Sequence, residues 1–263
     1  MVAASKLKRF QKLREQTIPY AQALEGIFNR LLATDIPLQH PLLETRKEKE
    51  IALLVITSDT GLCGSYNHGL IGEAQKFLAS RSQAPLLIGI GKYGVNSLTR
   101  SGRTWYRSFT DTKTSQLESV ITETSSLLET LFTEKKVDAV HVVYSHFTGR
   151  SVFRPITEKL LPFQLETTAD EPFETSSSYI MEPSREVLFA RLIPLVFASR
   201  IRMIFIESMI AEHTARMNAM YQATENAKDL IDALVLLRNK IRQAAITKEL
   251  IEIVSGSQAL KAG

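Results

Sequence analysis

The chain lacks several features that define common classes of protein. Its 263 residues include a single cysteine, Cys63, so no disulfide can form within the chain. No run of about 18 uncharged apolar residues occurs, and the best candidate, residues 193–206, is interrupted by Arg200 and Arg202. No apolar core and cleavage site follow the basic first residues, so a signal peptide is not predicted. We therefore expect a protein of a reducing compartment that does not insert directly into a bilayer.

The composition is that of a globular protein, with 44% hydrophobic and 23% charged residues, which excludes a disordered chain. The formal net charge of +4 is unevenly distributed. Residues 1–34 carry six lysines and arginines against two glutamates, and residues 233–248 carry four basic residues and no acid. These segments lack interleaved aromatics and any base-reading motif. They indicate an acidic protein surface at least as readily as a nucleic acid, and we predict no nucleic-acid partner.

Proline and glycine are absent from Leu195 to Val254, and Gly256 is the first predicted stop signal after this run. Sixty helical residues span roughly 90 Å, whereas a compact chain of this length has a radius of gyration of only about 18 Å. The sequence therefore predicts a helix that extends beyond its own globular domain.

The apolar residues of this helix recur every three or four positions, which is the repeat of a coiled coil. A second segment with the same spacing lies at the start of the chain, with Pro19 inside it as a predicted kink. Two such segments at opposite ends of a chain can pair as an antiparallel coiled coil; the alternative is two ordinary amphipathic helices folded onto a core. The repeat positions are Ala3, Leu7, Phe10, Ala21, Leu24, Phe28 and Leu31 in the first segment, and Ile206, Ile210, His213, Met217, Met220, Thr224, Ala227, Ile231, Leu234, Ile241 and Ala245 in the second.

Between these helices, short apolar runs alternate with helical patterns, which predicts a small α/β domain around a parallel or mixed sheet. Strands are expected at 51–56, 86–90 and 137–145, helices at 69–80, 92–100 and 117–134, and a further element at 153–163. The predicted fold is thus α/β, a long antiparallel coiled coil with a small Rossmann-like domain inserted between its helices. The expected divisions are an N-terminal helix at 1–34, the α/β domain at 50–165, a linker at 166–186 and the long helix at 187–263.

Two glycine-containing loops are candidates for ligand binding. Residues 89–94 match the G-x-G-x-x-G dinucleotide fingerprint, and Asp111 follows at the spacing of a ribose-binding acid. However, the preceding strand is the second of the domain, so a tight strand-to-helix turn is the favoured interpretation. The loop at 57–65 has no lysine in the position of a P-loop, and Cys63 with His68 lacks a third catalytic partner.

The histidines do not form a predicted metal site. His141 and His146 are five residues apart, which suits neither one helix face nor one strand face. His213 falls on the heptad seam, where a polar residue more often sets register than binds a ligand. We predict no catalytic, cofactor or metal site.

Five strings resemble those of the F-type ATP synthase gamma subunit, in the same order and across almost the whole chain. They are MVAASKL at 1–7 with Pro19-Tyr20-Ala21, SDTGLCGSYN at 58–67, EHTARM at 212–217, ATENA at 223–227, and ITKELIEIVSG at 246–256. The resemblance implies the central rotor shaft of a proton-translocating ATP synthase, with no catalytic site of its own. Rotation would then pass between the membrane c-ring and the catalytic alpha and beta subunits, with the epsilon subunit bound at the base.

The resemblance also implies a bacterial-type peripheral membrane protein on the cytoplasmic face of the inner (plasma) membrane. We expect the shaft to meet its partners through charged, small and flexible side chains, and the basic window to face acidic lever segments of the beta subunits. The interface candidates are Lys6, Lys8, Arg9, His213, Arg216, Met217, Arg238, Arg242, Lys248 and Glu249.

Three departures from the family strings stand out. In the family about twenty residues normally precede the first string, which Met1 opens here, so either the recorded start is internal or the shaft is shorter. Thr60 replaces the usual arginine, and Cys63 stands without the redox cysteine pair of plastid gamma chains. Two alternatives remain at this point: a nicotinamide-dependent α/β oxidoreductase with a coiled-coil appendage, and a coiled-coil adaptor unrelated to bioenergetics.

Overall fold

The computed structural model describes residues 2–32, 40–147, 153–163, 182 and 184–261, so most of the predicted linker lies outside the described residues. Residues 1–217 form one compact unit and residues 218–263 a second. The helices are α1 (Val2–Leu32), α2 (Tyr66–Ala79), α3 (Lys92–Arg100), α4 (Leu117–Thr133) and α5 (Arg185–Lys261), with short 3-10 turns at Pro41–Leu43 and Thr114–Gln116. The strands are β1 (Ile51–Ile56), β2 (Leu86–Ile90), β3 (Arg107–Phe109), β4 (Ala139–Phe147) and β5 (Phe153–Leu161).

The first unit contains a mixed five-stranded sheet in the order β3-β2-β1-β4-β5. β1 runs parallel to both β2 and β4, β2 runs parallel to β3, and β5 pairs antiparallel with β4. Every residue of β1 is buried, as expected for a central strand that is covered on both faces. The prediction of an α/β domain with a mixed sheet is confirmed.

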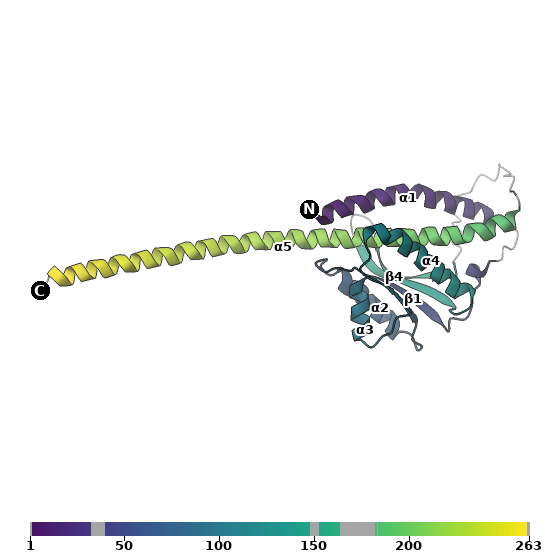
Figure 1. Cartoon of the computed structure of the whole chain (residues 1–263), viewed down its shortest axis with the longest axis horizontal. Helices are drawn as coiled ribbons and strands as arrows, with labels where there is room; N and C mark the ends of the chain where they lie inside the picture. Colours follow the sequence, from purple (N-terminus) through teal and green to yellow (C-terminus); the bar gives the residue numbers. More distant parts are fainter. Residues whose placement is uncertain (1, 33–39, 148–152, 164–181, 183, 262–263) are drawn as a thin grey trace. The chain divides into compact units, whose positions relative to one another are not determined.

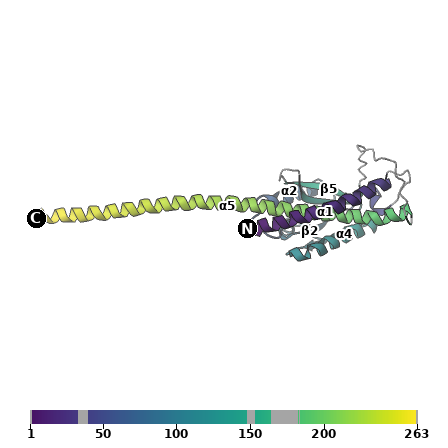
Figure 2. The same ribbon diagram turned by 90° about the horizontal axis from the view of Figure 1, so that it is seen from above.

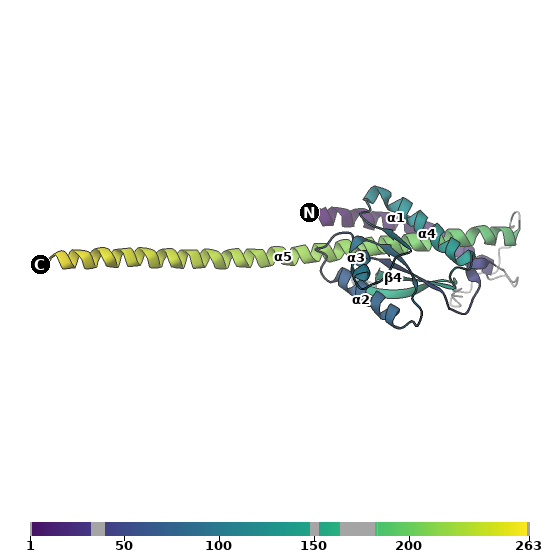
Figure 3. The same ribbon diagram turned by 60° about the horizontal axis from the view of Figure 1, so that its bottom comes forward.

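Alternate residues of β1 enter two different cores. Leu53 and Val55 pack with α2 and α3 on one face of the sheet. Leu54 and Ile56 pack on the other face with α4, α1 and the first part of α5. The sheet therefore lies between two helical layers (Figure 3), and the carboxyl ends of its parallel strands meet at one edge.

α1 runs antiparallel to the part of α5 that belongs to the same unit, and the two helices lie side by side (Figures 1 and 2). Phe10 near the start of α1 stacks on His213, with ring centroids 5.4 Å apart. Phe28 near the end of α1 stacks on Phe189, at 5.8 Å. The predicted antiparallel pairing is confirmed, and the same two helices also close the core over the sheet.

α5 is longer at both ends than the run that lacks proline and glycine. It includes Pro194 and continues to Lys261, so Gly256 does not act as a stop signal. A glycine in a helix costs only about 1 kcal/mol relative to alanine, which neighbouring helix-forming residues can offset. No described helix is both long and apolar enough to span a membrane.

Candidate functional site

The loop after β1 is held in a compact turn at the carboxyl edge of the sheet. Leu62 and Gly64 both have left-handed backbone conformations, with φ of 60° and 58°. Asn67 ties the ends of the loop together: its Oδ1 accepts from the Ser58 N–H at 3.0 Å, and its Nδ2 donates to Ser58 Oγ at 2.7 Å and to Cys63 Sγ at 3.2 Å. The Cys63 thiol is thereby buried as a packing group of the loop.

Asp59 attaches this loop to two other segments. Its Oδ1 accepts from the backbone N–H groups of Lys92 and Asp111, at 3.0 and 2.9 Å, and its Oδ2 accepts from that of Thr112 at 3.0 Å. Lys92 is the first residue of α3, and helix N-termini at this edge are where Rossmann-like domains bind phosphate. In this chain the Lys92 N–H at that terminus is bonded to the Asp59 carboxylate, and the side chain of Asp111 pairs with Lys92 Nζ at 3.4 Å.

The glycines of residues 89–94 serve close packing. Gly91 has φ of 88°, and a Cβ at this position would lie 2.1 Å from the carbonyl oxygen of Thr57. A Cβ at Gly94 would lie 2.7 Å from the side chain of Thr57, whose Oγ1 accepts from the Gly94 N–H at 2.9 Å. The fingerprint is therefore a tight strand-to-helix turn, and the oxidoreductase alternative is not supported.

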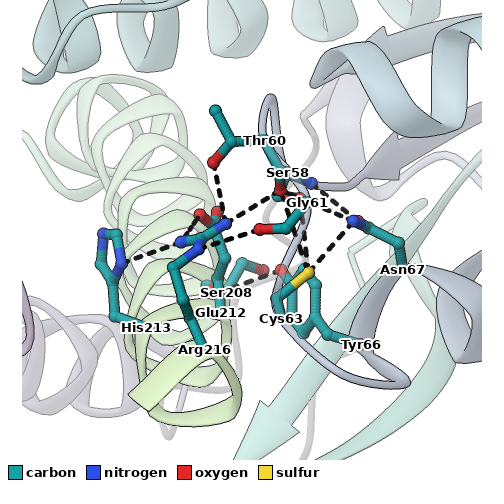
Figure 4. A network of polar contacts seen from close by, with 10 residues as sticks. All are labelled: Ser58, Thr60, Gly61, Cys63, Tyr66, Asn67, Ser208, Glu212, His213 and Arg216. Atoms are coloured by element: carbon teal, nitrogen blue, oxygen red, sulfur yellow. Dashed lines mark hydrogen bonds and ion pairs between the residues drawn. The ribbon is translucent and has the colours of Figure 1, made fainter. Parts of the chain in front are cut away.

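Arg216 of α5 clasps the loop (Figure 4). Its Nη2 donates to both the carbonyl oxygen and Oγ1 of Thr60, each at 2.9 Å, and its Nε donates to the Gly61 carbonyl at 3.2 Å. Its Nη1 donates to Glu212 Oε1 at 2.6 Å and to His213 Nδ1 at 3.2 Å. The guanidinium thus joins two turns of α5 to the loop that follows β1.

Burial shifts the pKa values of the two α5 side chains that bind Arg216. It raises the pKa of Glu212, although the hydrogen bond from Arg216 opposes the shift. Burial, together with the positive charges of Arg216 and Lys6, lowers the pKa of His213 to about 4. His213 is therefore neutral near pH 7, and its Nδ1 is free to accept from Arg216. A second link lies beside the clasp, where Tyr66 donates its hydroxyl to the carbonyl of Ser208 at 3.1 Å.

The structure gathers part of the predicted interface set at this junction. Lys6, His213 and Arg216 line one cavity of about 160 Å³ between α1, the loop and α5. His213 is buried in the pairing with α1, and the side chain of Arg216 is only 14% exposed. The remaining candidates are all exposed: Lys8 and Arg9 on α1, and Met217, Arg238, Arg242, Lys248 and Glu249 on α5.

The second unit is a helix with exposed apolar side chains. Leu236 and Ile253, for example, are 70% and 67% exposed. A helix that exposes such a series requires a partner to bury it. The exposed apolar residues of this unit are Met220, Tyr221, Leu230, Ile231, Leu234, Val235, Leu236, Leu237, Ile241, Ile246, Leu250, Ile251, Ile253 and Val254.

The basic side chains of the second unit differ in whether they form ion pairs. Lys228 lies 2.7 Å from Glu225, and Lys248 lies 3.9 Å from Glu252. For Arg238, Lys240 and Arg242, no ion pair is found within the part of the chain that the structure describes. These three form the exposed basic patch of the helix.

His141 and His146 do not form a site. The ring of His141 packs on Phe77, whereas His146 Nδ1 lies 3.1 Å from Glu207. Over the described ranges, no group of three or more metal-ligating side chains is present. The sequence alone assigned no bonds to Asp59 or Thr60, although both lie in the SDTGLCGSYN string directly after a buried strand.

A family model described as ATP synthase matches residues 1–260. The ATP synthase gamma chain of Desulforamulus reducens is 36% identical over 261 residues, which cover 99% of this chain and 91% of the relative. The chain belongs to the ATP synthase gamma chain family. The gamma chain of Moorella thermoacetica has the same identity and coverage.

Solved structures agree with this family at the level of the fold. A chain from the central stalk and c-ring structure of the Tetrahymena thermophila mitochondrial ATP synthase aligns with a TM-score of 0.61 at 22% identity, covering 85% of this chain and 96% of that one. A chain from the Euglena gracilis mitochondrial ATP synthase aligns with a TM-score of 0.59 at 17% identity, covering 99% and 96%.

Proposed function

We propose that this chain is the central-stalk gamma subunit of a proton-translocating ATP synthase. It transmits rotation between the ion-driven ring in the membrane and the catalytic alpha and beta subunits, in synthesis or hydrolysis of ATP. Membership of the gamma chain family supports this role. The observation that carries it is the apolar surface of residues 218–254, which the chain itself leaves exposed.

In this proposal the chain catalyses no reaction itself. Its partners are the alpha, beta and epsilon subunits and the c-ring, and it is held at the cytoplasmic face of a bacterial plasma membrane through them. The exposed helix meets the alpha and beta subunits, where rotation requires many weak contacts instead of one tight one. The α/β domain meets the base of the rotor.

We assign residues to the interface with the other subunits by their exposure and charge. Arg238, Arg242 and Lys248 face acidic segments of the beta subunits, with Glu249 beside them. Lys6, Lys8 and Arg9 add positive charge on α1. Attraction between opposite charges at such a surface acts on association and specificity, and it weakens with salt.

Co-purification of the tagged full chain with the alpha and beta subunits tests the proposal. We expect both subunits to be recovered with the wild type and to be lost with Leu234→Asp combined with Ile241→Asp, because these changes place charge in a buried apolar contact. Asn218→Asp combined with Gln222→Asp is the matched control at exposed polar positions of the same helix. Failure of the wild-type chain to recover alpha and beta subunits would refute the proposed function.

Charge reversal tests the proposed contact with acidic segments of the beta subunits separately. Arg242→Glu combined with Lys248→Glu is expected to lower both the ATPase activity of the assembled complex and its ATP-driven proton pumping, more strongly at low salt. Unchanged hydrolysis and pumping in this variant would exclude an acidic counterpart for these residues.

A further inference from the structure

Torque has to pass between α5 and the α/β domain if the proposed function holds, and this inference rests on that function. α5 and the sheet share a core, whose apolar contacts are non-directional. Directional contacts join α5 to the α/β domain at several points: Arg200 to Glu158, Arg202 to Glu118, Glu207 to His146, and the Ser208 carbonyl to Tyr66. Those with the loop after β1 are made by Arg216.

We infer that Arg216 is a positioning residue that locks α5 to the α/β domain, with Thr60 and Gly61 as its acceptors and Asp59 as the anchor of the loop. These hydrogen bonds form a continuous connection from α5 through the loop to the α/β domain. Arg216 binds residues 60 and 61, and the adjacent Asp59 binds the N-terminus of α3 and the segment after β3. A displacement of α5 along or around its axis therefore pulls on the carboxyl edge of the sheet.

The geometry of the guanidinium suits this role. Its planar fork donates to two successive residues of the loop from one side and to α5 from the other. Glu212 holds the fork in place at 2.6 Å, and neutral His213 accepts a further bond. Lysine has a single ammonium group and cannot reproduce this arrangement, so Arg216→Lys is not a conservative change here.

Thr60 offers the Arg216 guanidinium two acceptors, its backbone carbonyl and its hydroxyl. The hydroxyl accepts from Nη2 at 2.9 Å. Thr60→Val removes that acceptor at nearly constant volume, whereas Thr60→Ser retains it.

The buried thiol of Cys63 provides a direct readout of the loop, because it is the single cysteine of the sequence and is only 2% exposed. Thiol labelling of the full chain with a maleimide measures how often the loop opens. Hydrogen bonds from a charged donor stabilise by about 1.5–3 kcal/mol, so Arg216→Gln is expected to speed labelling by roughly tenfold to a hundredfold. Thr60→Val is expected to speed it by about tenfold or less, and Thr60→Ser is expected to return to within about twofold of the wild type.

The control for labelling is Thr122→Val on α4, where an exposed hydroxyl bonds only within its own helix, to the Glu118 carbonyl. It should leave the labelling rate unchanged. Thermal unfolding of each variant separates loop opening from global unfolding, since only the latter shifts the whole transition. Equal labelling of wild type and Arg216→Gln, at equal thermal stability, would overturn the inference.

The assembled ATP synthase provides the functional readout, the ratio of proton pumping to ATP hydrolysis. Arg216→Gln should assemble with alpha and beta subunits and hydrolyse ATP, but its ratio should fall several-fold, with a smaller fall for Thr60→Val and recovery in Thr60→Ser. A purely structural residue would lower assembly and leave the ratio of the assembled complexes unchanged, which also contradicts the inference. Because assembly of the wild type is measured in the same experiment, failure of the lock is distinguished from failure of the proposed function.

Discussion

α5 contains two stretches of one helix with the same apolar repeat and opposite surroundings. In residues 185–217, repeat positions such as Ile206 and Ile210 are buried against α1 and the sheet. In residues 218–254, equivalent positions such as Leu234 and Ile241 are 54% and 61% exposed. The repeat thus specifies that a helix needs a partner, and only the packing identifies which stretch has found one within the chain.

The two stretches also differ in the use of polar groups. In the first, Arg216 and Glu212 bind each other and the loop, and His213 is buried as a neutral ring. In the second, Lys228 and Lys248 pair only with glutamates one turn along the same helix. Polar residues of the first stretch define a tertiary contact, whereas those of the second are available to other chains.

Truncating one apolar residue in each stretch should give the largest difference between them. Phe205→Ala should lower the free energy of unfolding by about 3–5 kcal/mol, because it leaves a cavity in a closed core. Leu234→Ala should change it by less than about 0.5 kcal/mol, because the side chain is exposed in the isolated chain. Urea unfolding of both variants checks this, and a large loss from Leu234→Ala would show that the second stretch is packed within the chain.

Alanine in place of glycine should act in opposite directions in the two units. Gly91→Ala is expected to destabilise by about 2 kcal/mol or more, because it combines a left-handed φ with a clash at the Thr57 carbonyl. Gly256→Ala has no neighbour within 4 Å and should stabilise the helix by up to about 1 kcal/mol. Thermal melts followed by circular dichroism test both changes; dinucleotide binding that Gly91→Ala weakens would revive the oxidoreductase alternative.

The pH dependence of stability should come from the first unit. Native His213 stays neutral down to about pH 4, whereas the unfolded chain takes up this proton near 6.5. Between these values the unfolded state binds more protons, so stability falls as the pH is lowered. His213→Gln should make this slope shallower by up to about 1.4 kcal/mol per pH unit.

His141 is the internal reference for that measurement. Burial also lowers its pKa to about 4, so a similar contribution should remain in the His213 variant and disappear only in the double variant with His141→Gln. Urea unfolding at several pH values gives these slopes. An identical slope in wild type and His213→Gln would mean that the ring is charged in the native state.

The smallest expected effect concerns the surface pairs of the second unit. Glu225→Gln removes the partner of Lys228 and should cost about 0.5 kcal/mol or less of helix stability. The difference should vanish in about 1 M salt, because the pair is exposed and screened. A salt-independent loss in circular dichroism would instead indicate that Glu225 makes a buried contact.

Much of the fold was predictable because its signals are local. β1 was predicted from its six consecutive apolar residues. α3 begins and ends at the predicted residues. The antiparallel pairing of α1 with α5 followed from a repeat shared by both ends of the chain. Gly256, the first stop signal after the run without proline and glycine, does not end α5, because one weak residue does not determine a helix end by itself.

The candidate site was less predictable. The EHTARM and SDTGLCGSYN strings indicated the family, but not that Arg216 and Thr60, 156 residues apart, bind each other. Likewise, the spacing of Asp111 from the glycines is compatible with ribose binding. Only the structure shows that Asp59 binds the backbone N–H groups of both Lys92 and Asp111.

Periodicity and motifs are properties of neighbouring residues, so the classes of element, the heptad-patterned ends and the family could be predicted from them. The covered apolar residues of α5, the bonds of Asp59 to the start of α3, and the bonds of Arg216 to the loop could be recognised only in the folded chain. Each of these depends on groups brought together across a core, and their energies arise from burial and directional hydrogen bonds that no local pattern records.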